Sequence, residues 1–399
     1  MRIVRLANFV APHSGGLRTT LAELGAGYLA SGHEPVLVIP GERDGDEHTA
    51  QGRVITVRAP RLPFTGGYRV LWRRRRLARL LARLRPDALE VSDRTTLRWT
   101  GAWAREHGVP AVMVSHESVT ALLKMTGLAV AGLAPLGRAV ADRLNRRTAR
   151  AYQRIICTTG WAASEFERIG AGNLVRVPLG VDLATFTPAV HGSGQIRTRY
   201  VGEGQILLVH CGRLSPEKKP QRSLTTLATL RAEGMPVRLV VAGDGPLRPR
   251  LVRRAARAGL PVTFAGFLPG RAELAALLAS ADVAIAPGPA ETFGLAALEA
   301  LACGTPVVVS AESALPEVAG DAGASVAGED LAAGVRAVLA RPERARRAAA
   351  RARAERFDWA AAVRGFLAVH SAGQTGADQT GAQDEASHRD ELEVGRRPA

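Results

Sequence analysis

The stretch that decides the fold reads VAIAPGPAETFGLAALEALACG and covers residues 283–304. It opens with a short apolar strand, continues as a loop rich in proline and glycine, and ends with the composition of a helix. We predict that this helix begins near Phe293 and ends at Gly304, because glycine often follows the last helical turn. A buried strand that leads through a loop into a helix is the repeating unit of a parallel α/β sheet.

The same unit recurs along the whole chain. Apolar strands alternate with helical stretches, and the predicted strands are 2–6, 36–39, 54–57, 88–91, 111–115, 155–158, 206–211, 237–242, 262–265, 283–286 and 305–309. Short apolar strands separated by helices are typical of sheets that helices cover on both faces. The series predicts an α/β fold of two Rossmann-like, doubly wound parallel-sheet domains that face a cleft.

The domain boundary is predicted near residue 185, because the segment 191–205 that follows has no apolar periodicity. The N-terminal domain would cover residues 1–185 and the C-terminal domain residues 186–355. A helix at 356–370, which carries Phe357, Trp359 and Phe366, would pack back on the N-terminal domain. Residues 371–399 lose hydrophobic content and are predicted to be a disordered tail.

The composition excludes several classes of protein. Hydrophobic residues make up 46% and charged residues 23% of the 399 residues, which is typical of a soluble globular protein. No apolar run approaches the roughly 20 residues of a membrane-spanning helix, and we expect neither a signal peptide nor a targeting helix. Cys157, Cys211 and Cys303 are widely spaced, which excludes a disulfide framework or cysteine-based zinc cluster and fits a reducing cytoplasm.

The charge balance favours an anionic partner, because 53 Lys+Arg against 37 Asp+Glu give a net charge of +16. Only Lys124, Lys218 and Lys219 are lysines, and this preference for arginine resembles the codon usage of a GC-rich genome. The arginine excess is therefore weak evidence, whereas each lysine is informative. A basic nucleic-acid-binding protein remains an alternative, but the chain has no recognisable binding module and only 5% aromatic residues.

Residues suited to a diphosphate follow two strands of the second half. Arg213 and Lys218 come directly after the strand 206–211, and ligands of open α/β sheets bind at the carboxyl ends of strands. A guanidinium fork and a compact ammonium suit a diphosphate, although a solvated turn is the alternative. The strand 237–242 ends in Gly243 and Asp244, a tight turn that brings backbone and an acid to the same rim.

The stretch 283–304 carries the sharpest signal for chemistry. Glu291 stands just ahead of the helix, where a carboxylate can accept hydrogen bonds from sugar hydroxyls. The N–H groups of Phe293, Gly294 and Leu295 would face an incoming phosphate. Glu299 lies about two turns further on and would face a ribose, because a buried carboxylate needs a partner. The alternative is an exposed Glu on a surface helix.

Two features of the first half have both a functional and a structural interpretation. Gly15 and Gly16 precede a predicted helix and would let backbone N–H groups approach a phosphate, but an ordinary glycine turn explains them equally well. The pattern is not GxGxxG, which counts against a nicotinamide enzyme. His116 follows the strand 111–115 and could polarise a substrate hydroxyl, although a lone histidine is more often structural.

The Asp44-Gly45-Asp46 motif mimics the Asp-x-Asp of metal-dependent sugar transferases. It lies in a predicted polar loop, 41–48, with no strand before it, so we expect it to be solvated. No metal site is predicted from it.

Residues 70–85 predict an amphipathic helix with a basic face. Leu77, Leu80, Leu81 and Leu84 share one stripe. Four arginines are expected on the opposite side, Arg75, Arg76, Arg79 and Arg83, and two flank the stripe, Arg73 and Arg74. One interpretation is a helix packed on its sheet with a solvated face. The other is docking on anionic lipid, where each basic residue contributes about 1 kcal/mol. The apolar stretch 121–138 is either an acceptor-side loop or a buried helix pair.

The Gly15-Gly16 loop, His116, the Arg213/Lys218 pair and the Glu291-x7-Glu299 element together resemble the GT4 family of retaining nucleotide-sugar glycosyltransferases, whose fold is GT-B. The resemblance covers about residues 1–370. The stretches 14–19, 63–69 and 89–94 are more narrowly similar to bacterial GDP-mannose-dependent phosphatidylinositol-mannoside α-mannosyltransferases.

The resemblance implies a role for each motif. The N-terminal domain would bind the acceptor and the C-terminal domain the nucleotide sugar, with His116 near the anomeric carbon. Glu291 would bind the sugar and Glu299 the ribose. The implied catalytic residues are His116, Glu291, Arg213 and Lys218. The implied donor-binding residues are Gly15, Gly16, Arg213, Lys218, Gly243, Asp244, Glu291, Phe293, Gly294, Leu295 and Glu299.

The implied reaction moves a hexose, mannose from GDP-mannose, onto a phosphatidylinositol mannoside-type glycolipid and forms an α-glycosidic bond. The leaving phosphate would deprotonate the acceptor on the same face. No metal or other cofactor is expected, because fixed cations and N–H dipoles stabilise the leaving group. The protein would act in the cytoplasm at the inner face of the plasma membrane, with no nucleic-acid partner. The alternatives are a GT4 transferase that uses a UDP- or ADP-linked sugar on a soluble acceptor, and a GT-B-fold sugar-nucleotide epimerase.

Overall fold

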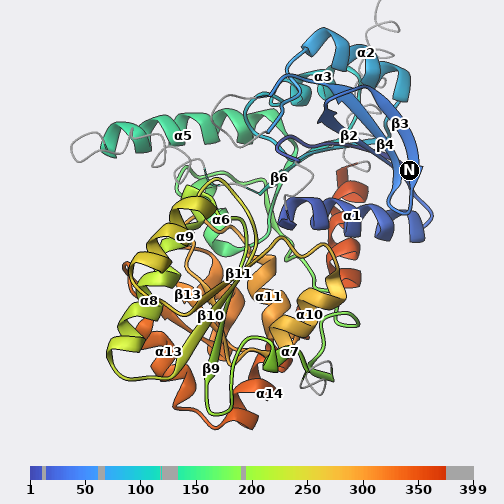
Figure 1. Ribbon diagram of the computed structural model, residues 1–399. Coiled ribbons are helices and arrows are strands. Elements are labelled where there is room, and N and C mark those ends of the chain that lie inside the picture. Colours follow the sequence, from blue (N-terminus) through green and yellow to red (C-terminus); the bar gives the residue numbers. More distant parts are fainter. Residues whose placement is uncertain (11–14, 62–67, 117, 119–133, 190–194, 374–399) are drawn as a thin grey trace, which may run out of the picture.

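Two parallel-sheet domains make up the molecule, as the strand series predicts (Figure 1). The structure, a computed structural model, describes residues 1–10, 15–61, 68–116, 118, 134–189 and 195–373. The first sheet has the order β3-β4-β2-β1-β5-β6-β7-β8 and the second β11-β10-β9-β12-β13-β14. The chain enters each sheet near its centre, at β1 and β9, and then builds outwards on both sides, which makes both sheets doubly wound.

The strands are buried in the way that parallel sheets require. Every residue of β5 and β6 is buried, because helices cover both faces of the sheet. The strands of the first sheet are β1 (Arg2–Leu6), β2 (Glu34–Gly41), β3 (Gly45–Thr49), β4 (Gly52–Arg58), β5 (Ala88–Val91), β6 (Ala111–Ser115), β7 (Arg154–Cys157) and β8 (Leu174–Arg176). Those of the second are β9 (Ile206–Cys211), β10 (Val237–Ala242), β11 (Val262–Gly266), β12 (Val283–Ala286), β13 (Val307–Ser310) and β14 (Gly323–Val326).

Helices connect these strands and form the outer layers. The N-terminal domain contains α1 (Gly15–Ala30), α2 (Arg74–Leu84), α3 (Thr100–Glu106), α5 (Ala134–Ala151) and α6 (Gly160–Glu167). The C-terminal domain contains α7 (Gln195–Thr198), α8 (Gln221–Ala232), α9 (Arg248–Arg257), α10 (Arg271–Ser280), α11 (Leu295–Ala302), α12 (Leu315–Ala319), α13 (Ala332–Leu339) and α14 (Glu343–Ala354). Short 3-10 helices cover Pro216–Lys218 and Gly320–Ala322. Cys157, Cys211 and Cys303 are free thiols.

The prediction of a loop at 41–48 with no strand before it is wrong. Strand β2 runs to Gly41, and β3 pairs antiparallel with β4 from Gly45 onwards. β3 is an exposed edge strand, so it has no apolar alternation for sequence analysis to detect. The two acids are exposed and held by arginines: Asp46 pairs with Arg53 at 2.6 Å and Asp44 with Arg76 at 2.7 Å.

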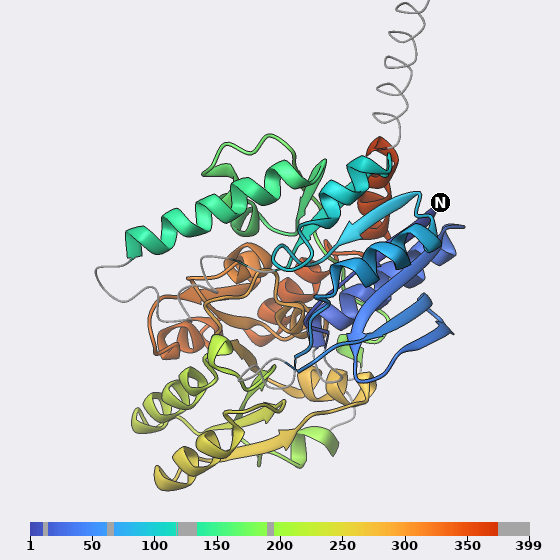
Figure 2. The same cartoon turned by 90° about the horizontal axis from the view of Figure 1, so that it is seen from above.

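The last helix of the described chain, residues 359–373, lies against the N-terminal domain (Figures 1 and 2). Its Val363 packs against Gly27 of α1 so closely that a Cβ at Gly27 would lie 2.3 Å from the Val363 Cγ2 atom. Phe366 is fully buried in a hydrophobic core that contains residues of both domains. This helix therefore packs the last described residues against the first helix of the chain.

A buried polar cluster fixes the end of the same helix. The Glu90 carboxylate accepts hydrogen bonds from Arg5 Nε at 2.8 Å and Tyr28 Oη at 2.8 Å, and His370 Nε2 lies 3.2 Å from it. All four side chains are 2% exposed or less. Burial alone would raise the pKa of Glu90, but the charge of Arg5 and the contact with His370 hold it well below its ordinary value. Glu90 is therefore ionised at neutral pH, and its carboxylate links Arg5 to His370 inside the fold.

Candidate active site

The loops that follow the strands of both sheets meet at the junction between the two domains. The Thr292 hydroxyl, in the loop after β12, donates to the backbone oxygen of His116 after β6 at 2.7 Å. The Thr159 hydroxyl, after β7, donates to the Thr292 oxygen at 2.9 Å. Glu317 of α12 adds an ion pair to Arg176 at 2.6 Å. The carboxyl ends of the two sheets therefore face each other, which is where open α/β sheets bind ligands.

Lys218 and Glu291 are in direct contact at this junction. The Lys218 ammonium lies 2.7 Å from the Glu291 Oε1 atom, and the side chains are 32% and 22% exposed. Burial alone would lower the pKa of Lys218, but the charge and hydrogen bond of Glu291 raise it above the ordinary value, so the lysine is charged at neutral pH. The structure thus brings together two residues that lie 73 positions apart in the chain, with both side chains still open to a ligand.

Arg213 follows a close contact between two loops, and that contact requires a glycine at position 243. Gly243, after β10, has a φ of 151°, and a Cβ there would lie 1.9 Å from the Gly212 oxygen. The loops after β9 and β10 can therefore touch at the base of the site. The Arg213 guanidinium stacks on the ring of Tyr68 from the N-terminal domain, at 4.4 Å from the ring centroid. A donor-site candidate of one domain is thus covered by an aromatic residue of the other.

The start of α11 is shaped by Gly294, which has a φ of 86° and precedes the first helical residue, Leu295. A Cβ at Gly294 would lie 2.1 Å from Leu315 Cδ2, so the position favours glycine on both counts. Phe293 is 4% exposed and packs edge-on against Phe357, which leaves only its backbone for a ligand. Across the junction, a Cβ at Gly16 would lie 3.9 Å from Leu295 Cδ1, so the beginnings of α1 and α11 face each other.

Glu299 has an unusual protonation equilibrium. Burial raises the pKa of this carboxyl to about 7, with Asp182 adding to the rise and Arg271 opposing it. Arg271 lies 3.3 Å from Asp182 and 3.1 Å from Glu23, so it forms ion pairs with two other acids. Glu299 therefore changes charge in the neutral range, which is common at binding and catalytic sites.

His116 is neutral over the physiological range. Burial is the main cause that lowers its pKa to about 4, with Arg5 and Arg94 adding to the effect and Glu90 opposing it. A neutral imidazole can accept or donate a hydrogen bond but adds no charge near a departing phosphate. Its position after β6 and the bond from Thr292 place its backbone at the junction, beside the Glu291 loop.

For two of the candidate positions, the described residues show no side-chain contact with this group, although the Asp244 backbone oxygen accepts a hydrogen bond from Leu214 N, next to Arg213, at 2.9 Å. Asp244 is exposed, and its carboxylate accepts a hydrogen bond from the next backbone amide, Gly245 N, at 2.7 Å. A Cβ at Gly15 would meet nothing within 4 Å. The stretch 121–138 lies largely outside the described residues. The roles of these positions stay predictions.

Sequence analysis did not name Tyr68 or Thr292 as site residues. Thr292 lies inside the motif that carries Glu291, so its position next to an acid was the available signal. Tyr68 follows a Gly-Gly pair in the first domain, and its proximity to Arg213 depends on how the two domains pack. No pattern along the chain records that packing.

Comparison with known proteins agrees with this arrangement. The protein-family model described as Glycosyltransferase Family 4 matches residues 14–185. The family model described as Glycosyl transferases group 1 matches residues 196–355. Among solved structures, sucrose-phosphate synthase from Thermosynechococcus elongatus superposes with a TM-score of 0.73 at 20% identity, over 97% of this chain and 100% of that one. Anabaena HepE in complex with UDP and glucose superposes with a TM-score of 0.70 at 19% identity, over 93% and 99%. These likenesses concern the fold.

Two curated relatives are similar in sequence. A protein of Mycobacterium tuberculosis (strain ATCC 25177 / H37Ra), named GDP-mannose-dependent alpha-(1-6)-phosphatidylinositol dimannoside mannosyltransferase, is 52% identical over 92% of this chain and 96% of its own length. A GDP-mannose-dependent alpha-mannosyltransferase of Mycolicibacterium smegmatis (strain ATCC 700084 / mc(2)155) is 30% identical over 77% and 79%. The resemblance drawn from the motifs and the two-domain GT-B fold are both confirmed. The chain belongs to glycosyltransferase family 4.

Proposed function

We propose that this protein transfers mannose from GDP-mannose, with retention of configuration, to a phosphatidylinositol dimannoside-type glycolipid and forms an α-glycosidic bond. The observation that carries the proposal is the relative that is 52% identical over almost the whole chain and is named for this donor and acceptor. The side chains at the interdomain junction support it, because they combine cations for a diphosphate with a carboxylate for sugar hydroxyls.

The arrangement suits a reaction whose leaving group gains negative charge. As the bond between sugar and diphosphate breaks, Arg213 and the charged Lys218 stabilise the departing phosphate. Glu291 balances the lysine before the donor binds and offers an oxygen to a sugar hydroxyl. The departing phosphate takes the acceptor proton on the same face, so no residue of the chain is assigned as a base. We also propose that fixed cations and helix amides replace a metal in this step.

The test is release of GDP by the purified chain, measured with GDP-mannose and a phosphatidylinositol dimannoside acceptor. We expect turnover that needs both substrates and that EDTA leaves unchanged within about twofold. Turnover of a UDP- or ADP-linked sugar on a soluble acceptor would replace the proposal with its first alternative. Conversion of the nucleotide sugar without any acceptor would indicate an epimerase. A rate that EDTA abolishes and Mg²⁺ restores would refute the proposal that no metal is required.

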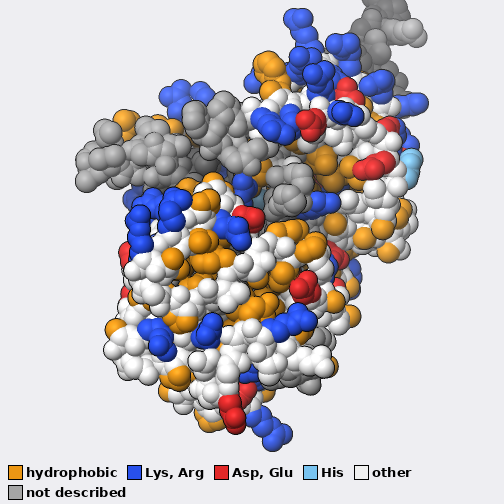
Figure 3. Space-filling model, in the orientation of Figure 1, with side chains coloured by type: hydrophobic (Ala, Val, Ile, Leu, Met, Phe, Trp, Pro, Cys, Tyr) orange, Lys and Arg blue, Asp and Glu red, His pale blue; other side chains and the backbone are white. Residues whose placement is uncertain are grey.

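We further propose that helix α2 docks the protein on an anionic membrane, at the inner face of the plasma membrane. Within the described residues, no helix combines the length and apolar character that crossing a bilayer needs. Helix α2 buries Leu77, Leu81 and Leu84 against the sheet and leaves its arginines outside. Figure 3 shows them as a basic patch at the top of the N-terminal domain. Trp72, which is 57% exposed, stands at its edge.

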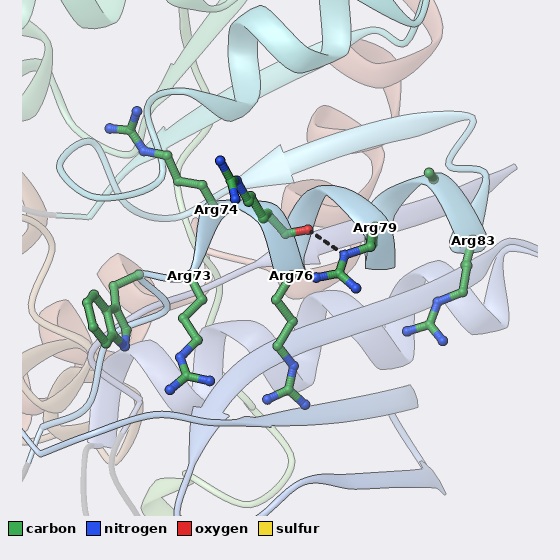
Figure 4. A pocket seen from close by; sticks show the side chains of 8 residues that line it. Arg73, Arg74, Arg76, Arg79 and Arg83 are labelled. Carbon is green, nitrogen blue, oxygen red and sulfur yellow. Dashed lines mark hydrogen bonds between the residues drawn. The ribbon is translucent and has the colours of Figure 1, made fainter.

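The exposed face of helix α2 contains a depression as well as a cluster of positive charges. An open depression of about 960 Å³ is lined by Trp72, Arg73, Arg74, Arg75, Arg76, Arg79, Ala82 and Arg83. Arg73, Arg76 and Arg83 extend on one side of the helix in Figure 4, whereas Arg74 extends on the other. A tryptophan among guanidinium groups suits the boundary between lipid headgroups and acyl chains. This combination supports membrane docking over a merely solvated helix face.

Replacing Arg75, Arg79 and Arg83 together by alanine is expected to weaken binding to vesicles of phosphatidylcholine and phosphatidylinositol about a hundredfold. Each arginine near an anionic surface contributes about 1 kcal/mol, and three such losses correspond to about two decades. These three side chains are exposed, and within the described residues they form no ion pair. Vesicle sedimentation at several salt concentrations measures the change.

The matched control is a triple alanine variant of Arg250, Arg253 and Arg257, which are also exposed and lie on α9 of the other domain. It removes the same charge and should bind vesicles within about twofold of the unmodified chain. Equal losses in both variants would mean that net charge alone drives binding and would overturn docking through α2.

A further inference from the structure

Three side chains in successive contact, Phe9, Tyr68 and Arg213, connect the N-terminal domain to the donor site. The Arg213 guanidinium lies over the Tyr68 ring at 4.4 Å from its centroid. Tyr68 in turn meets the ring of Phe9 edge to face, with centroids 5.8 Å apart and planes at 87°. Phe9 follows strand β1, Tyr68 precedes helix α2, and Arg213 follows β9 of the other domain. Three elements from distant parts of the sequence are therefore ordered around one guanidinium.

Phe9, the first of these three residues, has a strained backbone conformation. Phe9 has a φ of 59°, in the left-handed region that residues other than glycine rarely adopt. Such a conformation costs on the order of 1–3 kcal/mol and persists only where the surroundings enforce it. It therefore points to a constraint on where the Phe9 ring lies.

The neighbouring residue, Asn8, supplies the constraint. It is 0% exposed. Its Oδ1 atom accepts a hydrogen bond from Leu71 N at 2.8 Å. Its Nδ2 atom donates to Asp93 Oδ2 at 2.9 Å and to Thr96 Oγ1 at 2.8 Å. One buried amide thus ties the backbone next to Phe9 to the backbone three residues beyond Tyr68. The two rings are fixed relative to each other before any ligand arrives.

We propose that Tyr68 is a positioning residue, which holds the Arg213 guanidinium in the orientation that grips the donor diphosphate. The inference rests on the proposed function, in which Arg213 binds that diphosphate. A ring stacked on the face of a guanidinium leaves its N–H groups pointing outward in the guanidinium plane, which is the direction from which a phosphate is bound by a fork of N–H donors. The stack also removes rotamer freedom from a long side chain, so less entropy is lost when the donor binds. Because Tyr68 belongs to the acceptor-side domain, this contact forms only while the two domains are together.

The test measures equilibrium binding of GDP and GMP without acceptor, so that contacts to a lipid play no part. Tyr68→Ala is expected to weaken GDP binding about fivefold to tenfold, the range of a partly desolvated cation–π contact, and GMP binding by less than twofold. Tyr68→Phe keeps the ring and should bind GDP within twofold of the unmodified chain. Leu29→Ala, which changes an exposed side chain at the far end of α1, should leave both affinities unchanged.

A double-variant comparison separates positioning of Arg213 from direct contact with the nucleotide. Methionine at position 213 has neither a charge nor a planar group to stack on the ring, so Tyr68→Ala should change GDP binding by less than twofold in an Arg213→Met background. An equal loss in both backgrounds, or no loss in either, would overturn the proposal. If the unmodified chain binds UDP or ADP instead of GDP, the proposed donor is wrong, and the same comparison with that diphosphate and its monophosphate decides the role of Tyr68.

Discussion

Replacing Lys218 by methionine is expected to lower kcat about a hundredfold to a thousandfold. Removing one fixed group that stabilises charge in a transition state has an effect of this size. Lys218 is suited to that task because it is charged and half-buried. Its ammonium lies 2.7 Å from Glu291, in the loop between β12 and α11. Methionine has a similar length and no charge, so packing changes little. Initial rates of GDP release at saturating donor and acceptor measure the effect.

Lys219 offers a matched control in the next position of the chain. Its ammonium lies 3.7 Å from Glu329 and is 39% exposed, away from Glu291. Lys219→Met removes the same charge from the same loop, and we expect its kcat to stay within about threefold of the unmodified chain. Thermal unfolding of both variants should show that neither is unfolded at the assay temperature. Equal rates in the two variants would refute the role of Lys218.

The Lys218→Met variant also tests how Glu291 affects donor binding. Without Lys218, the carboxylate has lost its cation while it remains only 22% exposed. An unpaired acid beside an incoming diphosphate repels it, so KM for the donor should rise as kcat falls. In Lys218→Met/Glu291→Gln the repulsion disappears, and KM should recover in part while kcat stays low. Such a split separates electrostatic repulsion in the ground state from lost stabilisation of the transition state.

The sheets could be predicted from sequence where burial left a pattern. Strands such as β5, β6 and β12 are apolar along their length because both faces are covered, and each was predicted within a residue or two of its bounds. β3, β8 and β14 were missed. β3 is exposed, β8 has three half-buried or exposed residues, and β14 contains Gly, Ala and Ser. Edge strands hold their place by backbone pairing, and that pairing leaves little trace in side-chain type.

The features of the candidate site also fall into two groups, those that sequence can predict and those that only the structure shows. Arg213, Lys218 and Glu291 could be proposed from sequence because each follows a strand, and strand ends of a parallel sheet gather at one edge. The contact of Tyr68 with Arg213 could not, because it depends on the packing of two domains. The pKa of Glu299 was equally hidden, since it arises from burial and from two residues, Arg271 and Asp182, on other elements. Sequence patterns identify groups at sheet edges, whereas distances across domains need the structure.

Glu299→Gln is expected to weaken binding of GDP-mannose at pH 8 about tenfold and to remove the pH dependence of that binding. In the proposed function the Glu299 carboxylate accepts hydrogen bonds from the ribose, and hydrogen bonds to charged groups are worth about 1.5–3 kcal/mol. Because burial raises the pKa of Glu299 to about 7, most molecules of the unmodified chain hold a proton there at pH 6. Because the protonated carboxyl should bind like the glutamine variant, donor affinity should fall about fivefold between pH 8 and pH 6. Calorimetric titration at both pH values measures this difference.

The same substitution should stabilise the protein in the absence of donor. The folded-state pKa of Glu299, about 7, lies above the ordinary value of 4.5, so the folded chain binds the proton more tightly than the unfolded chain. Ionisation of this carboxyl consequently lowers the free energy of unfolding as the pH rises from about 4.5 through about 7. Glutamine carries no charge, so Glu299→Gln should raise the free energy of unfolding by about 2–3 kcal/mol at pH 8 and by little near pH 5. A chain that folds more stably yet binds its donor less tightly is the signature of a carboxylate kept for the ligand. Lower stability at pH 8, or unchanged donor affinity, would show that Glu299 serves the fold instead.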